Sequence, residues 1–109
     1  MPTFNNRHRH YEDLRDAKVG GAEAQVAAAK AQVAAANARL KASSKDATRA
    51  EELINRGTVS EQRLEEAVAL RDADAAALQV ARAELQAAEI DLDRTTIRAR
   101  LSGSIGRSF

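Results

Sequence analysis

The sequence predicts an all-α protein, a long antiparallel two-helix coiled-coil hairpin with a short β-prone tail at its C-terminus. Three observations lead to this fold class. The only proline among the 109 residues is Pro2, so no later position is closed to a helix on that ground. Apolar residues make up 44% of the chain but aromatic residues only 3%, so a thick globular core is not expected. Apolar residues also recur at heptad spacing through two long segments.

The first 21 residues are polar and only weakly periodic, and we expect a flexible or loosely helical arm there. Gly20 and Gly21 interrupt the chain before the strong pattern begins. His8 and His10 are two positions apart, which is poor spacing for two metal ligands on one helix face. We therefore interpret these histidines as solvated residues of a basic arm, and we expect no metal site.

A first helix is predicted over residues 22–56. Large and small apolar residues alternate along it at the a and d positions of four heptads: Val26, Val33, Leu40, Ala47 and Ile54 at a, and Ala29, Ala36, Ser43 and Ala50 at d. Because the d residues are very small, a partner helix can approach closely. The helix is expected to stop at Arg56, where a cation suits the dipole, with Gly57 as the residue after the C-cap.

A short tip is predicted over residues 57–60, made of Gly57, Thr58, Val59 and Ser60. Thr58 and Glu61 have the spacing of a capping box, and Ser60 is an alternative N-cap for the next helix. A link this short makes the second helix fold back beside the first.

The second helix is predicted over residues 61–94. Its a positions hold Leu64, Leu78, Leu85 and Leu92, with Arg71 in the missing slot, and its d positions hold Ala67, Ala81 and Ala88, with Asp74 as the exception. The seam therefore contains a polar layer or a stutter near Arg71 and Asp74. A local phase shift that brings Leu70 and the alanines of 73–77 into the contact is the alternative.

The character of the sequence changes over residues 95–109. The run from Thr95 to Ala99 is β-prone and alternating, and the run from Leu101 to Gly106 has the pattern of strand, turn and strand. A single strand at a chain end needs a sheet to join, so we expect its pairing partner to lie outside this chain.

Composition and motifs exclude several classes of function. A net charge of +1 argues against a nucleic-acid binder, and 30% charged residues leave no apolar run long enough to span a bilayer. No catalytic constellation, phosphate loop or cofactor motif is present, so we expect no enzyme and no cofactor. No apolar segment follows Met1 and the chain has no cysteine, so we expect neither a secretory leader nor a lipid anchor here.

The order of elements resembles the periplasmic adaptors, the HlyD-like membrane fusion proteins of tripartite efflux and secretion systems. In that family a helical hairpin is inserted between two halves of a lipoyl-like β domain, and the returning strand typically reads T-x-I-x-A-P-x-S-G-x-I-G. Residues Thr95 to Gly106 are similar to it, with Arg100 in place of the proline. The resemblance is greatest to adaptors of resistance-nodulation-division pumps, and it implies that residues 95–109 begin a lipoyl-like segment.

The tip gives a second resemblance. Adaptors that dock onto TolC-type outer-membrane channels carry an arginine, a leucine four residues later and a serine seven after that. Arg49, Leu53 and Ser60 have this spacing. The resemblance implies that these three residues bind the channel, that several hairpins associate side by side, and that domains absent here contact an inner-membrane transporter. It also implies a periplasmic location, attached to the inner membrane.

Two other interpretations stay open from the sequence. One is a generic self-associating coiled-coil scaffold with no transport role. The other, an amphipathic helix lying on a lipid surface, is weaker, because the apolar stripe is narrow and rich in alanine and has no tryptophan to enter lipid.

Overall fold

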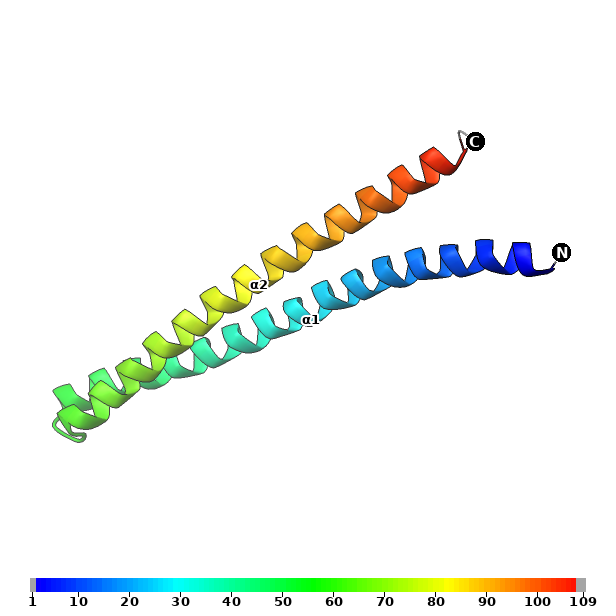
Figure 1. Ribbon diagram of the computed structural model, residues 1–109. Helices are drawn as coiled ribbons and strands as arrows, with labels where there is room; N and C mark the ends of the chain where they lie inside the picture. Colours follow the sequence, from blue (N-terminus) through cyan, green and yellow to red (C-terminus); the bar gives the residue numbers. More distant parts are fainter. Residues whose placement is uncertain (1, 108–109) are drawn as a thin grey trace. The chain divides into compact units, whose positions relative to one another are not determined.

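The computed structural model describes the backbone of residues 2–107 and the side chains of residues 16–101. This part of the chain forms two α-helices, α1 over Pro2–Asn55 and α2 over Glu61–Arg107 (Figure 1). It divides into two compact units. The turn unit, residues 29–84, holds the turn and the adjoining part of each helix, and the terminal unit holds the remaining stretches of α1 and α2. The predicted all-α hairpin is confirmed.

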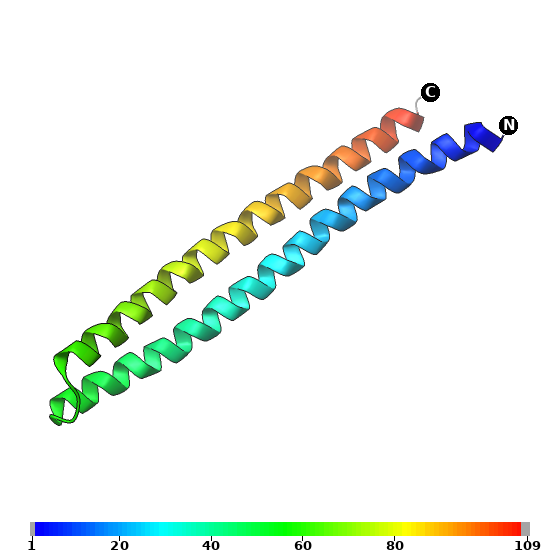
Figure 2. The same ribbon diagram turned by 60° about the horizontal axis from the view of Figure 1, so that its bottom comes forward.

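In the turn unit the two helices run antiparallel and side by side, as both ribbon views show (Figures 1 and 2). Two apolar clusters hold them together. The middle cluster consists of buried Ala36, Leu78 and Ala81 with the partly buried Val33 and Leu40. The tip cluster consists of buried Ala47, Ala50 and Ala67 with the partly buried Leu64. Every one of these residues occupies a predicted a or d position.

The small residues of the seam are buried between the two helices, and the close helix approach stays a prediction. Ala47 is completely buried, and Ala36, Ala50 and Ala67 are at most 5% exposed. These alanines share their clusters with larger side chains, such as Leu78 and Leu64. Dispersion contacts around each methyl group therefore supplement its modest hydrophobic gain, about 0.8 kcal/mol per buried methyl-sized group.

The seam of α2 keeps its seven-residue spacing through the polar positions. Arg71 and Asp74 are both half-buried, whereas Leu70 is 53% exposed. A phase shift would bury Leu70, so the structure contains a polar layer at Arg71 and Asp74 without a stutter.

The same spacing holds within the terminal unit. Ala22 and Val26 of α1 are buried there. On α2, Leu85, Ala88 and Leu92 are half-buried at their predicted seam positions.

The expected interruption at Gly20 and Gly21 is wrong, since α1 is helical from Pro2 onward and runs through both glycines; a helix is one of the two forms, flexible or loosely helical, that we expected for this arm. Each glycine costs a helix interior only about 1 kcal/mol relative to alanine. Extending an existing helix is much easier than starting one, so the strong helix from residue 22 continues through that cost. Met1 lies outside the described residues.

The C-terminal stretch also differs from the expected β-prone tail. Residues Thr95–Arg107 continue α2, and Thr95 donates its side-chain hydroxyl hydrogen to the Asp91 carbonyl at 2.8 Å. An unpaired strand leaves its backbone groups unsatisfied, whereas a helix satisfies them within one segment. The assignment of residues 95–109 to a lipoyl-like domain stays a prediction, and residues 108–109 lie outside the described part.

Candidate functional site at the hairpin tip

The end of α1 is closed by a Schellman turn, which fixes the position of Leu53. Gly57 has a φ of +75°, the left-handed conformation that glycine adopts at little cost. Its N–H donates to the Ile54 carbonyl at 3.0 Å, and the Thr58 N–H donates to the Leu53 carbonyl at 2.9 Å. The Thr58 hydroxyl also donates to the Leu53 carbonyl, at 3.0 Å. The prediction of Gly57 at this position is confirmed by the geometry, and Thr58 serves the end of α1.

The start of α2 is capped by Ser60. The Ser60 hydroxyl oxygen accepts a hydrogen bond from the Arg63 N–H at 3.2 Å, and its carbonyl accepts one from the Leu64 N–H. This is the geometry of an N-cap residue, so of the two candidates, Thr58 and Ser60, the structure selects Ser60. Because the serine oxygen is the acceptor, its hydroxyl hydrogen is still available to a partner.

The three residues singled out by spacing lie around this turn. Arg49 and Leu53 are one helical turn apart on α1, and Ser60 directly precedes α2. Arg49 and Ser60 are exposed, whereas Leu53 is half-buried. Val59 is half-buried and Thr58 exposed. The tip therefore presents a cation, part of an apolar side chain and a hydroxyl to its surroundings.

The positive charge of Arg49 has no partner among the described side chains of the tip. Among the described side chains it makes no ion pair and no hydrogen bond. A guanidinium with five donors and no internal acceptor suits the carbonyls or carboxylates of another protein. Its removal is therefore expected to cost the fold little.

An ion pair that the sequence analysis did not identify ties the helices together behind the tip. Arg63 of α2 lies 3.3 Å from a carboxylate oxygen of Asp46 of α1, and both side chains are partly exposed, at 52% and 38%. A pair this exposed contributes at most about 1 kcal/mol. Each partner directly precedes a seam residue, and this shared heptad position was the signal that could have identified the pair.

The tip combines charged, polar and apolar groups on one end of the hairpin. Within residues 16–101 no group of three acidic or histidine side chains is placed to hold a metal ion. Nowhere in the described helices does an apolar stretch reach the length and hydropathy needed to cross a membrane. What the tip offers is donors, a hydroxyl and a small apolar surface, all held by a rigid turn.

Comparison with known families gives one match. The model of the RND MFP alpha-helical hairpin domain, from the resistance-nodulation-division membrane fusion proteins, matches residues 25–95. That range covers both helices of the turn unit, the turn itself and Arg49, Leu53 and Ser60. No curated protein and no solved structure matches the chain. The members of the matched family are periplasmic adaptors, and in that family the hairpin is a non-enzymatic adaptor domain. The chain belongs to the RND membrane fusion proteins, and residues 25–95 are their α-helical hairpin domain.

Proposed function

We propose that this hairpin is the arm with which a periplasmic adaptor links an inner-membrane transporter to a TolC-type outer-membrane channel. The tip binds the channel through Arg49, Leu53 and Ser60, and hairpins of several copies lie side by side. Contact with the transporter belongs to adaptor domains outside the hairpin. The role is mechanical, since the hairpin positions and bridges and carries out no chemistry.

The observation that supports docking most is the unused cation at the tip of a family hairpin. Arg49 is exposed and has no partner among the described side chains, on a helix end held by the Schellman turn. Leu53 lies on the same face, and its carbonyl is already bonded to Thr58. A rigid surface of this kind binds without the entropy cost of ordering a loop.

The experiment that tests docking is a binding titration of the chain against a purified TolC-type channel from the same organism. The unmodified chain is compared with the Arg49→Asp variant, whose expected loss of affinity is derived in the Discussion. Saturable binding that depends on Arg49 supports the proposal, and the absence of binding by the unmodified chain contradicts it.

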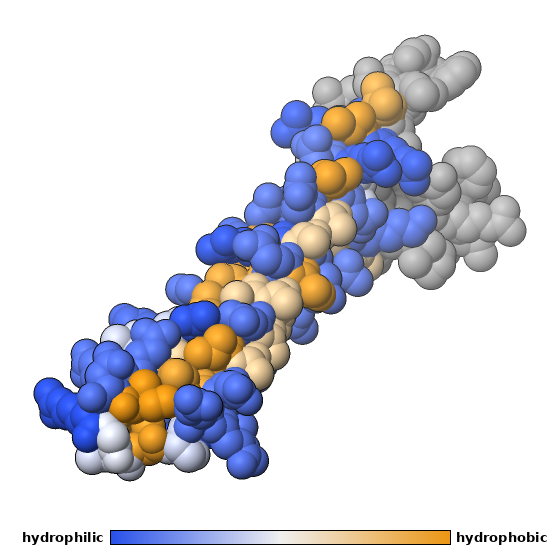
Figure 3. Space-filling model, turned by 90° about the vertical axis from the view of Figure 1, so that its left-hand side faces the viewer, coloured by the Kyte–Doolittle hydropathy of each residue, from blue (hydrophilic) through white to orange (hydrophobic). Residues whose placement is uncertain are grey.

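Side-by-side packing is supported by a second apolar seam on the outside of each helix. All its residues are exposed and follow three- and four-residue spacing. On α1 the outer seam within the turn unit consists of Ala31, Ala35, Ala38 and Ala42, and on α2 of Ala69, Ala73, Ala76, Val80 and Ala83. The spacing places each outer seam opposite the inner seam of its own helix. Figure 3, a view from the turn end, shows that apolar side chains also reach the surface near the turn, bordered by hydrophilic ones.

The charges around the two outer seams are complementary. Residues 31–45 of α1 contain three basic and no acidic residues, namely Arg39, Lys41 and Lys45. Residues 65–84 of α2 contain five acidic and two basic residues, and Glu65, Asp72 and Glu84 are exposed among them. Two α1 faces therefore repel each other, whereas α1 of one copy attracts α2 of the next. Such a contact between two different faces can repeat from one copy to the next. It closes into a ring when the rotation between neighbouring copies adds up to a full turn.

This arrangement predicts a disulfide between copies. Ala36 and Leu78 share the middle cluster, so Ala38 of α1 lies level with Ala76 of α2. The natural chain has no cysteine, and these two alanines belong to the outer seams on opposite sides of the turn unit. Mild oxidation of an equal mixture of the single variants Ala38→Cys and Ala76→Cys is expected to give a mixed dimer on a non-reducing gel.

Each cysteine variant oxidised alone is the control, and it is expected to give little dimer. Equal dimer formation in the separate variants and in the mixture would show contact between like faces, and the complete absence of dimer would show that the seams do not meet. The generic scaffold alternative also allows lateral dimers, so it is distinguished only by the failure of the chain to bind the channel.

A further inference from the structure

The apolar contact inside the turn unit is divided into two blocks. The largest buried side chain of the middle cluster is Leu78, and the partly buried Val33 and Leu40 pack against the cluster. In the tip cluster the buried side chains are all alanines, and Leu64 is only partly buried. No residue belongs to both clusters. The tip cluster is therefore the smaller and weaker block.

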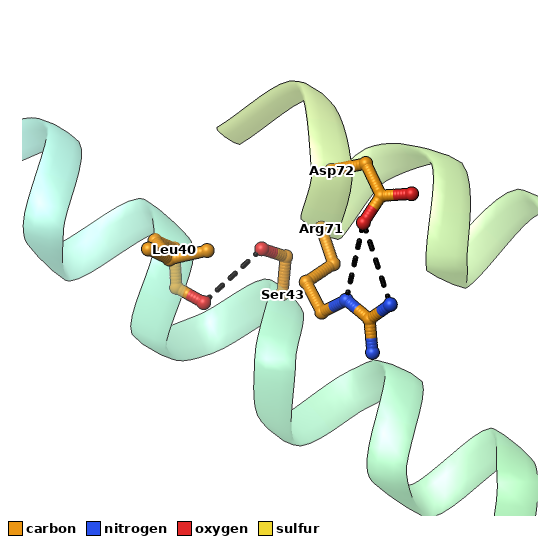
Figure 4. Close-up of polar contacts among 4 residues, drawn as sticks. All are labelled: Leu40, Ser43, Arg71 and Asp72. Carbon is orange, nitrogen blue, oxygen red and sulfur yellow. Dashed lines mark hydrogen bonds and ion pairs between the residues drawn. The ribbon is translucent and has the colours of Figure 1, made fainter. Parts of the chain in front are cut away.

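A polar layer lies between the blocks and consists of Ser43 on α1 with Arg71 and Asp74 on α2. Ser43 is 5% exposed, and its hydroxyl donates to the Leu40 carbonyl of its own helix at 3.2 Å. The Arg71 guanidinium donates to the carboxylate of its neighbour Asp72 at 3.3 and 3.4 Å. Figure 4 shows these three hydrogen bonds, each of them within one helix.

The layer therefore interrupts the apolar contact between α1 and α2 and does not replace it with polar bonds between the helices. Among the described side chains, no hydrogen bond or ion pair joins α1 to α2 at Ser43, Arg71 or Asp74. The described polar link between the helices in this unit is the partly exposed pair of Arg63 and Asp46, which lies on the tip side of the layer. The two blocks share no apolar cluster, and at the layer the described side chains form no bond between the helices, so the continuous backbones of α1 and α2 connect the blocks.

We propose that the polar layer is a break in cooperativity that lets the tip block, residues 44–70, open and close separately from the rest of the turn unit. Once α1 and α2 separate there, the stretches 44–55 and 61–70 lose the packing that stabilises them and fray from the helix ends at the turn. They unfold locally and expose their amide groups. Residues 33–40 and 75–81, held by the middle cluster, stay folded during this opening.

The break places the docking residues on the movable block, since Arg49, Leu53 and Ser60 all lie within residues 44–70. In docking, the channel binds the closed and rigid tip, so its binding shifts the tip block from the open toward the closed state. This use in docking rests on the proposed function, whereas the opening itself is a property of the chain alone and is measured without any channel.

The test is native-state hydrogen exchange of the chain and of Arg71→Leu. In the natural chain, amides of residues 47–54 and 64–69 are expected to exchange at least about tenfold faster than those of residues 33–40 and 77–81, after correction for intrinsic rates. Arg71→Leu places an apolar side chain between the two clusters and joins them. It is expected to slow amide exchange in the tip block until the amides of the two blocks exchange at equal rates.

A matched control is Arg82→Leu, the same substitution at an exposed position of α2 outside the layer. It is expected to leave the difference between the blocks unchanged. Asp74→Ala, a second variant of the layer, is expected to act in the same direction as Arg71→Leu. Equal protection of both blocks in the natural chain, or a difference that survives both layer variants, overturns the proposal.

Discussion

Arg49→Asp is expected to lower the affinity of the chain for a TolC-type channel by about 100-fold or more. Removing one partner of a hydrogen-bonded charge pair that becomes buried in an interface costs about 2–5 kcal/mol, which is about 30-fold or more at 1.4 kcal/mol per tenfold change. The reversed charge adds repulsion toward the acceptors that the arginine contacts. Because Arg49 is exposed and makes no ion pair among the described side chains, the helix itself loses little. Titration of the chain against the surface-immobilised channel measures the affinity, and circular dichroism checks the helix content.

Arg82→Asp is the matched control, since Arg82 is also exposed but lies on α2 away from the tip. It changes the net charge by the same amount, and its effect on affinity is expected to be less than about threefold. Arg49→Lys keeps the charge and loses the planar fork, so an intermediate affinity is expected. Equal losses for Arg49→Asp and Arg82→Asp would mean that total charge governs binding and that the tip does not.

Leu78→Ala is expected to destabilise the hairpin by about 2–5 kcal/mol, the usual effect of a large-to-small change at a buried position. Leu78 is 4% exposed and is the only leucine among the buried residues of the described part. Its neighbours Ala36 and Ala81 are too small to fill the space that its loss leaves. A hairpin with an alanine seam has little stability to spare, so the variant is expected to be largely unfolded at 37 °C. Urea denaturation followed by circular dichroism measures the change at a fixed protein concentration.

Leu70→Ala provides the same chemical change on the same helix at a position that is 53% exposed. It is expected to alter the free energy of unfolding by less than about 1 kcal/mol. If the two variants were equally destabilised, the assignment of Leu78 to the inner seam and of Leu70 to the outside would be wrong.

The inner seam could be predicted from the sequence because it depends on spacing alone. Ala29, Ala36 and Ala50 were assigned to d positions by counting, and all three are buried. A seven-residue repeat fixes which side of a helix faces its partner, whatever the side chains are. Arg71 was harder, since a charged residue at an a position fits a stutter as well as a polar layer, and only the exposure of Leu70 separates them.

The tip could be predicted in part. Gly57 was identifiable because only glycine adopts a positive φ at little cost, and the structure has it at +75°. Whether Thr58 or Ser60 capped α2 was not decidable, since both are good N-cap residues. The decision came from the Schellman turn, which directs the Thr58 N–H and hydroxyl toward Leu53 and leaves the cap to Ser60. The binding role of Arg49, Leu53 and Ser60 stays a proposal.

The two ends were predicted less well, because their local preferences are weak and their structure depends on what they contact. Residues 95–107 have a β-prone sequence, but a strand requires a neighbouring strand for its backbone hydrogen bonds, and α2 supplies helical ones instead. Gly20 and Gly21 lower helix propensity without forbidding a helix, so an established helix passes through them.

The most direct test of docking is to place a photoreactive phenylalanine analogue at Leu53 in the chain, in cells that also make the TolC-type channel. The same analogue at Gln79, an exposed position in the middle of α2, is the comparison. On irradiation, position 53 is expected to give a covalent product with the channel, and position 79 is expected to give products only with other copies of the chain. Absence of a channel product from position 53, or an equal yield from both positions, would contradict docking through the tip.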